Sequence, residues 1–159
     1  MSERQRVKLP SADATEAVGK RLAIAVAAIA PERFNIHLRG DLGAGKTTCA
    51  RGFLAGLGHR DRVPSPTYTL VEPYELEAFT VYHADLYRVR GAEEVAYLGL
   101  HEPAGDASIW LIEWPEHGGE ALDAADLTLG FEIADPGRWL QFGANSDAGH
   151  NVLEAFDLD

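Results

Sequence analysis

The chain contains a single cysteine, Cys49, and this scarcity excludes two classes of structure. One thiol cannot form an internal disulfide, and it cannot supply the several thiolates of a zinc cluster. The six histidines show no spacing that is typical of metal ligands. We therefore expect neither a disulfide framework nor a structural zinc site.

Long hydrophobic runs are also missing. The longest apolar run, Leu22–Ala30, is too short and too rich in alanine to span a bilayer. The polar N-terminal residues Met1–Arg6 are not followed by the apolar segment of a signal peptide. We expect a soluble, cytoplasmic protein.

Basic residues are few, with 14 Lys and Arg against 25 Asp and Glu, which gives a net charge of −11. A protein that grips nucleic acid by its phosphates normally presents a basic surface. We therefore expect no autonomous binding to nucleic acid and no association with a membrane.

The remaining composition is that of a folded domain. Of the 159 residues, 46% are hydrophobic and 9% are aromatic, and a chain of this length buries about two-thirds of its unfolded surface. There are no repeats and no linker. We expect one domain over residues 1–144, followed by a loosely ordered acidic tail over residues 145–159.

The segment Gly40–Thr47 reads GDLGAGKT and fits the phosphate-binding pattern G-x-x-x-x-G-K-[ST] without a departure. Glycines let several backbone N–H groups turn toward one anion. Lys46 would bridge the outer phosphates, and the Thr47 hydroxyl would hold Mg²⁺. The predicted nucleotide contacts in this segment are Asp41, Leu42, Gly43, Ala44, Gly45, Lys46, Thr47 and Thr48.

The flanking segments have the periodicity that this pattern requires. Upstream, residues Phe34–Arg39 alternate like a strand. Downstream, an apolar helical face at i, i+3, i+4 and i+7 ends at a glycine; its residues are Ala50, Phe53, Leu54 and Leu57, with Gly58 after them. Strand, loop and helix in this order indicate a protein that binds a nucleoside triphosphate.

The other segments predict a mixed sheet. A first helix begins with Ser11 or Asp13 as its cap and ends at Pro31. Two hairpins are expected, one from residues 68–74 and 79–83 and one from residues 127–133 and 138–142, while residues 108–114 form a buried strand. We predict an α/β fold, a three-layer P-loop NTPase domain. Its sheet has parallel strands around residues 34–39 and 108–114 and antiparallel hairpins at the edges.

Two acidic residues follow predicted strands and are candidates to complete the site. Glu113 ends an apolar run, and Asp85 comes directly after the strand that begins at Phe79. The carboxyl ends of parallel strands lie near the phosphates in folds of this kind. Hydrolysis requires such groups, because Mg²⁺ and the attacking water must be positioned. A solvated loop acid is the alternative interpretation of each residue.

Four further positions carry weaker signals. Thr67, together with Thr69, lies in a proline-flanked segment and is a candidate sensor of the γ-phosphate, or an ordinary turn residue. Trp114 follows Glu113 and is expected either at the rim of the site or in the core. His83 precedes Asp85, and its role is left open.

Taken together, the segments resemble the bacterial TsaE (YjeE) family of small P-loop ATPases. Four landmarks occur in the same order: Leu38–Thr47, Ser65–Val71, His83–Arg88 and Ile112–Trp114. The resemblance covers roughly residues 7–144.

The resemblance implies roles for individual residues. Lys46 would bind phosphates, Thr47 and Glu113 would hold Mg²⁺, and Asp85 would be the catalytic acid near the γ-phosphate. Thr15 and Arg138 would approach the adenosine part of ATP, and Trp114 would support the site. The implied activity is ATP hydrolysis in threonylcarbamoyladenosine (t6A) modification of tRNA, with the TsaD and TsaB proteins as partners. Because no arginine is obviously placed for fast hydrolysis, we expect the isolated chain to hydrolyse ATP slowly and its partners to raise the rate.

Three alternatives stay open. A nucleotide-gated adaptor with negligible turnover is compatible with the same motifs. A small-molecule kinase would need an acceptor site and a basic lid, for which only Arg88 and Arg90 lie in a suitable stretch. A GTPase would normally carry an Asn-Lys-x-Asp segment, which this sequence does not contain.

Overall fold

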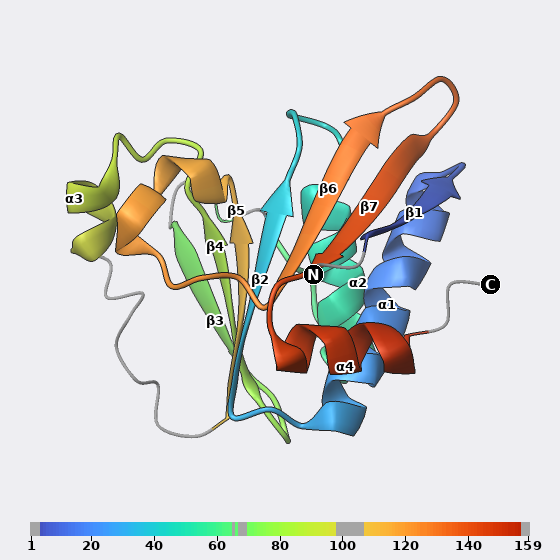
Figure 1. Cartoon of the computed structure of the whole chain (residues 1–159), viewed down its shortest axis with the longest axis horizontal. Coiled ribbons are helices and arrows are strands. Elements are labelled where there is room, and N and C mark those ends of the chain that lie inside the picture. The colour runs from blue at the N-terminus through green and yellow to red at the C-terminus, as the bar shows by residue number, and fades with distance from the viewer. Residues whose placement is uncertain (1–3, 65, 67–69, 98–106, 157–159) are drawn as a thin grey trace.

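In the computed structural model, the described residues (4–64, 66, 70–97 and 107–156) form one seven-stranded sheet with helices packed against it (Figure 1). The strands are β1 (Arg4–Leu9), β2 (Arg33–Arg39), β3 (Val71–Glu75), β4 (Thr80–Asp85), β5 (Ser108–Glu113), β6 (Leu127–Ile133) and β7 (Arg138–Ala144). The α-helices are α1 (Ala12–Ile29), α2 (Lys46–Gly56), α3 (Ala92–Ala96) and α4 (Asp147–Ala155), and two short 3₁₀ helices are η1 (Pro115–His117) and η2 (Gly119–Ala121).

The strand order is β1-β7-β6-β2-β5-β4-β3. β2 runs parallel to both of its neighbours, β5 and β6, and β4 runs parallel to β5. The pairs β3–β4, β6–β7 and β1–β7 are antiparallel. The predicted fold class, with a parallel centre and antiparallel edges, is therefore confirmed.

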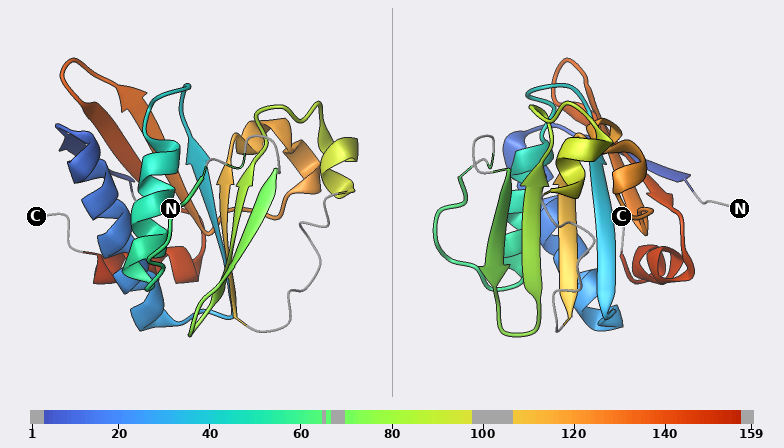
Figure 2. Two further views of the ribbon diagram at one scale, coloured as in Figure 1. Left: turned by 180° about the vertical axis from the view of Figure 1, so that it is seen from behind. Right: turned by 90° about the vertical axis from the view of Figure 1, so that its left-hand side faces the viewer.

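One face of the sheet is covered by α1 and α2, which lie side by side in the left view of Figure 2. α1 begins where the Ser11 hydroxyl accepts a hydrogen bond from the Ala14 N–H at 3.1 Å, so Ser11 and not Asp13 is the cap. The two helices touch closely at Gly52, where an added Cβ would lie 2.0 Å from the carbonyl oxygen of Glu16. Only glycine permits this approach.

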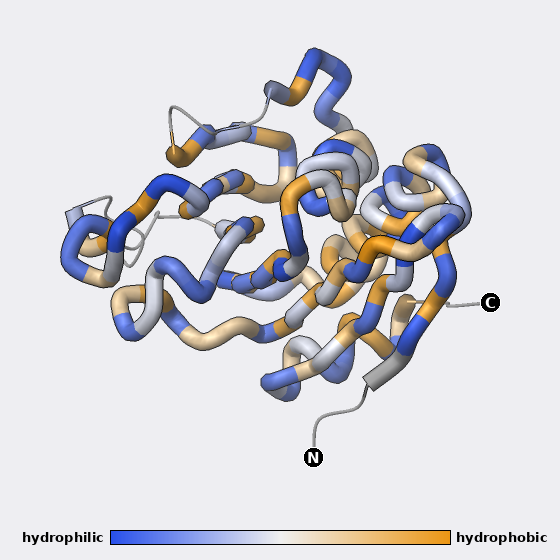
Figure 3. Tube along the Cα trace, turned by 90° about the horizontal axis from the view of Figure 1, so that it is seen from above, coloured by the Kyte–Doolittle hydropathy of each residue, from blue (hydrophilic) through white to orange (hydrophobic). Residues whose placement is uncertain are grey.

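Side chains of β4 and β5 alternate between two apolar clusters, one on each face of the sheet. Along the whole chain, hydrophobic and hydrophilic residues are interspersed, as Figure 3 shows. Val81 and Leu111 belong to the large cluster beneath α1 and α2, whereas Ala84 and Ile112 belong to a smaller cluster on the opposite face. By this alternation, residues 83, 85 and 113 all lie on the face that α1 and α2 cover.

The C-terminal residues differ from the expectation of a loosely ordered tail after residue 144. Residues 147–155 form α4, and Val152, Leu153 and Phe156 are buried in the main core. The Phe156 ring packs 5.1 Å from that of Phe142, centroid to centroid. The spaced apolar residues that look isolated in an acidic sequence thus form one face of an amphipathic helix.

None of the helices in the described part of the chain has the length and apolar character needed to cross a membrane.

Candidate functional site

The loop Gly40–Thr47 joins β2 to α2 at the carboxyl edge of the parallel strands (Figure 1). Its glycines at 40, 43 and 45 all have positive φ, and Gly45 is the residue that precedes α2. A Cβ on Gly45 would lie 2.5 Å from Nη1 of Arg138. The loop therefore turns its backbone toward the start of a helix, where unpaired N–H groups and the helix dipole favour an anion.

The Lys46 ammonium lies within this loop. It donates a hydrogen bond to the carbonyl oxygen of Gly40, and its Nζ lies 3.7 Å from the centroid of the Trp114 ring. Burial lowers the pKa of Lys46, while the carboxylates of Glu113 and Asp85 act in the opposite direction. The cation is thus placed beside both predicted acids.

Glu113 meets Thr47 directly at the ends of β5 and the loop. The Thr47 hydroxyl lies 3.0 Å from Oε1 and 2.9 Å from Oε2 of Glu113, a residue that is only 3% exposed. A hydroxyl and a carboxylate are hard oxygen donors, the type that Mg²⁺ prefers. Within the described residues no group of three or more His, Cys, Asp or Glu side chains forms a metal site. Mg²⁺ in nucleotide sites commonly takes only one or two carboxylates, with phosphates and waters as the other ligands, so this pair fits it.

Asp85 ends β4 and is the register partner of Glu113. Its Oδ1 accepts a hydrogen bond from the Tyr87 N–H at 3.0 Å. Burial raises the pKa of Asp85, the nearby Glu113 raises it further, and the hydrogen bond from Tyr87 opposes the shift. Such a carboxyl is suited to accepting a proton closer to neutral pH than an exposed aspartate.

Trp114 lies at the rim, immediately after β5. Its backbone has φ of 57°, which is uncommon for a bulky residue and reverses the chain into η1. Its ring packs against those of Tyr87 and His117, at centroid distances of 5.1 and 5.3 Å. These contacts hold the indole over Lys46. The sequence did not single out Tyr87 or His117, because their proximity depends on the path of the chain after β4 and β5.

Arg138 and Thr15 approach the loop from the opposite side. Arg138 begins β7, and its Nη1 donates to the carbonyl oxygen of Ala44 at 3.1 Å. Thr15 is buried in α1, where its hydroxyl donates to the carbonyl oxygen of Ser11 at 3.2 Å and its methyl group faces Gly45. Arg138 is therefore at the site surface, whereas Thr15 supports the loop from behind.

One pocket gathers most of the residues that the sequence predicts. Its lining comprises Leu42, Gly43, Gly45, Lys46, Thr47, Thr48, Asp85, Glu113, Trp114 and Arg138. Asp41 is exposed beside it, Ala44 and Thr15 are buried and do not line it, and Thr67 lies outside the described residues. The pocket thus combines the loop, the two strand-end acids and one cation from β7.

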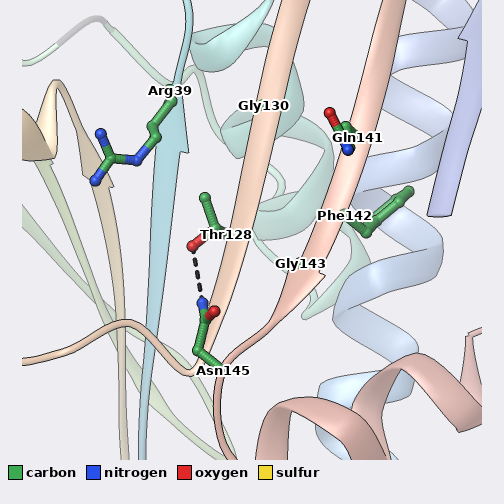
Figure 4. A pocket seen from close by; sticks show the side chains of 7 residues that line it. All are labelled: Arg39, Thr128, Gly130, Gln141, Phe142, Gly143 and Asn145. Atoms are coloured by element: carbon green, nitrogen blue, oxygen red, sulfur yellow. Dashed lines mark hydrogen bonds between the residues drawn. The ribbon is translucent and has the colours of Figure 1, made fainter. Parts of the chain in front are cut away.

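A second pocket lies elsewhere on the sheet and shares no residue with the loop (Figure 4). It is lined by Arg39, Thr128, Gly130, Gln141, Phe142, Gly143 and Asn145. Asn145 Nδ2 donates to the Thr128 hydroxyl at 2.9 Å there. This pocket lacks paired carboxylates, so we place the candidate chemistry in the first.

His83 is the site neighbour that the sequence left unassigned. Its Nε2 lies 2.6 Å from Oε2 of Glu113, and the His83 side chain is fully buried. The alternation of strand side chains was the available signal, because residues 83 and 85 must share one face of β4. The partner across the strands was not available without the strand order.

Comparisons with known proteins identify a family that matches most of this chain. Residues 9–138 match the family described as threonylcarbamoyl adenosine biosynthesis protein TsaE. A tRNA threonylcarbamoyladenosine biosynthesis protein TsaE from Haemophilus influenzae is 44% identical over 121 residues, covering 76% of this chain and 77% of the relative. The protein of the same name from Bacillus subtilis is 41% identical over 95 residues, covering 60% of this chain and 59% of the relative.

Among solved structures, the crystal structure of Bacillus subtilis YdiB is similar to this fold. It superimposes with a TM-score of 0.78 at 28% identity, over 98% of this chain and 95% of YdiB. The family match covers most of the chain, and the Haemophilus influenzae relative and the shared fold agree with it. The chain therefore belongs to the TsaE family.

Proposed function

We propose that this protein binds ATP with Mg²⁺, hydrolyses it slowly, and supports t6A modification of tRNA together with TsaD and TsaB. Membership of the TsaE family supports the pathway, since the curated relatives carry it in their names. The pocket geometry supports the nucleotide chemistry.

The contact between Thr47 and Glu113 carries this proposal. Their oxygen atoms lie 2.9–3.0 Å apart at the start of α2, so one hydroxyl and one carboxylate can share a cation that also binds phosphate oxygens. When bound, Mg²⁺ would neutralise the charge that develops on the phosphates during transfer. Thr47 and Glu113 would hold it.

The loop and Lys46 would bind the phosphates. Residues 43–48 form the end of the loop and the first turn of α2, where unpaired N–H groups and the helix dipole favour an anion. Lys46 would exchange its hydrogen bond to the Gly40 carbonyl for phosphate oxygens, which offer a full negative charge in place of a dipole. Arg138 would contact the adenosine side of the nucleotide.

Asp85 would orient the attacking water and accept its proton. It lines the pocket beside its register partner Glu113, and its Oδ1 accepts a hydrogen bond from the Tyr87 N–H. Its raised pKa suits a proton acceptor. The two acids therefore divide the work between proton transfer and metal binding.

Slow turnover is expected for the isolated chain. Among the described residues that line the pocket, Arg138 is the one arginine, and its Nη1 is engaged by the Ala44 carbonyl. Hydrolases of this class gain several orders of magnitude when a free arginine neutralises the transferring phosphate. We expect TsaD–TsaB to raise the rate. Docking on proteins also agrees with the net charge of −11, which disfavours direct contact with tRNA.

The test is ATP hydrolysis by the purified chain, alone and with saturating TsaD–TsaB, for the wild type and two glutamate variants. Glu113→Ala should abolish the stimulated rate. Glu132→Ala is the control, because Glu132 is an exposed glutamate on β6 that does not line the pocket that contains Glu113; it should retain the rate.

Two other outcomes would contradict ATP hydrolysis and indicate a different function. ATP binding without turnover in either condition would indicate a nucleotide-gated adaptor. Transfer of the γ-phosphate to an acceptor other than water would indicate a kinase.

A further inference from the structure

His83 occupies a position from which it can act only through another side chain. It is fully buried, and it does not line the pocket that holds the loop and the acids. It points from β4 to Glu113, which lies two residues beyond its own register partner, Leu111, on β5. A substrate in the pocket would therefore meet Glu113 and not His83.

The hydrogen bond between them has a defined direction. A carboxylate oxygen can only accept, so the proton in the 2.6 Å contact belongs to Nε2 of His83. The other ring nitrogen, Nδ1, is buried without a hydrogen-bond partner in the described part of the chain. The polar function of this imidazole is therefore directed at one atom, Oε2 of Glu113.

Because of this contact, the two oxygens of Glu113 have different hydrogen-bond partners. Oε2 accepts from both His83 and Thr47, whereas Oε1 has only Thr47 as a partner among the described residues. If the Thr47 hydroxyl turns its lone pairs to a cation, His83 still holds Oε2. Oε1 would then be left facing the loop.

We propose that His83 is a positioning residue that fixes the Glu113 carboxylate toward Thr47 and so sets the affinity of the site for Mg²⁺. This rests on the proposed use of Mg²⁺ and ATP. Partners that orient a metal ligand from behind commonly change metal affinity or activity by about 10- to 100-fold. Because His83 does not line the pocket, a nucleotide bound there would not touch it, and nucleotide affinity in the absence of Mg²⁺ should stay the same.

Two amide substitutions separate this role from simple packing. The amide nitrogen of His83→Gln can stand near Nε2 and keep the donor to Glu113, whereas the shorter amide of His83→Asn ends near Nδ1 and cannot reach it. Both place an amide in the same buried position. His37→Asn is the matched control, because His37 is a buried histidine on β2 with no hydrogen bond to Glu113 among the contacts described.

The experiment titrates MgCl₂ into the full chain with a non-hydrolysable ATP analogue, and follows binding by calorimetry; ATP hydrolysis is measured in parallel. For His83→Asn we expect the Mg²⁺ concentration at half-saturation to rise about 10- to 100-fold and kcat to fall by a similar factor. Analogue affinity without Mg²⁺ should stay within about twofold, since the N–H groups of the loop and Lys46 are unchanged. His83→Gln and His37→Asn should remain close to the wild type.

The outcomes separate this inference from the proposed function. Wild-type affinity and turnover that do not depend on Mg²⁺ would overturn both. A Mg²⁺-dependent wild type with His83→Asn unchanged, or with His83→Gln impaired as severely as His83→Asn, would overturn the role of His83 alone. If thermal unfolding shows that His83→Asn does not fold, His83→Met, an apolar side chain of similar length without a donor, replaces it with the same expected loss.

Discussion

Asp85 and Glu113 stand side by side as register partners at the ends of β4 and β5, yet their surroundings differ. Glu113 accepts hydrogen bonds from the side chains of Thr47 and His83, and Oδ1 of Asp85 accepts from the backbone N–H of Tyr87. Two carboxyl groups in unlike environments are a common basis for dividing chemical roles.

Substitution of Lys46 and of Asp85 should impair the protein for different reasons. Lys46→Ala should lose nucleotide affinity by more than about tenfold, because a charge-assisted contact to phosphate is removed. Asp85→Asn should bind ATP within about threefold of the wild type and lose about 100-fold or more in turnover. Calorimetric binding and phosphate release measure the two quantities. Equal loss of binding in both variants would contradict the role of Asp85.

The charge of Asp85 should cost stability at neutral pH. Burial raises the pKa of Asp85 in the folded protein above the ordinary 3.8. At pH values between the unfolded-state pKa and the folded-state pKa, the folded state therefore binds more protons than the unfolded state. Stability due to this group therefore falls as pH rises through that window, and the penalty is complete above the folded-state pKa.

Asp85→Asn keeps an oxygen for the Tyr87 N–H and removes the charge. We expect its midpoint of thermal unfolding to exceed that of the wild type at about pH 7, and the difference to vanish only well below the unfolded-state pKa, at about pH 3. A difference that does not change across this range would show that burial of the charge is not its cause.

Gly45→Ala should damage the loop more than an otherwise similar substitution elsewhere. Gly45 has φ of 115°, and an added Cβ would lie 2.5 Å from the Arg138 guanidinium. We expect a loss of about 2 kcal/mol in the free energy of unfolding and at least tenfold in ATP affinity. Gly58→Ala is the control: φ is 102° and no atom lies within 4 Å of the new Cβ. Urea unfolding should show about 1 kcal/mol for this variant, and ATP affinity should be unchanged.

The C-terminal helix should contribute to stability and not to nucleotide binding. Phe156 is 5% exposed and contacts the Phe142 ring and the Arg21 guanidinium, at 5.1 and 4.8 Å. Phe156→Ala should lower the free energy of unfolding by about 3 kcal/mol. Ile133→Ala, at a side chain that is 59% exposed, should change it by less than about 0.5 kcal/mol. A loss of ATP affinity in Phe156→Ala would contradict the separation of helix and site.

Several features of the site were predictable from short stretches of sequence. The glycines and Lys46 of the loop satisfy local conformational needs, and the acids at 85 and 113 follow segments whose alternation indicates strands. The hairpins were equally predictable, because a tight turn between alternating segments pairs neighbours along the chain. The fold class followed from these elements in order.

The prediction of a loosely ordered tail after residue 144 was wrong, because α4 depends on packing against distant segments. A nine-residue segment whose large apolar side chains are Val152 and Leu153 does not form a stable helix by itself, since most helical stability in proteins comes from packing. α4 packs against α1 and β7, and neither contact is visible from the residues of α4 alone.

By itself, the sequence determined the phosphate-binding loop, its place between a strand and a helix, and the acids near the carboxyl ends of strands, because each depends on residues close together in the chain. The tertiary structure alone decided that β5 lies between β2 and β4. This order brings Glu113 to Thr47 across 66 positions and to His83 across 30. Contacts of a few ångströms between distant segments depend on strand order and register, and these are set by how the whole core packs.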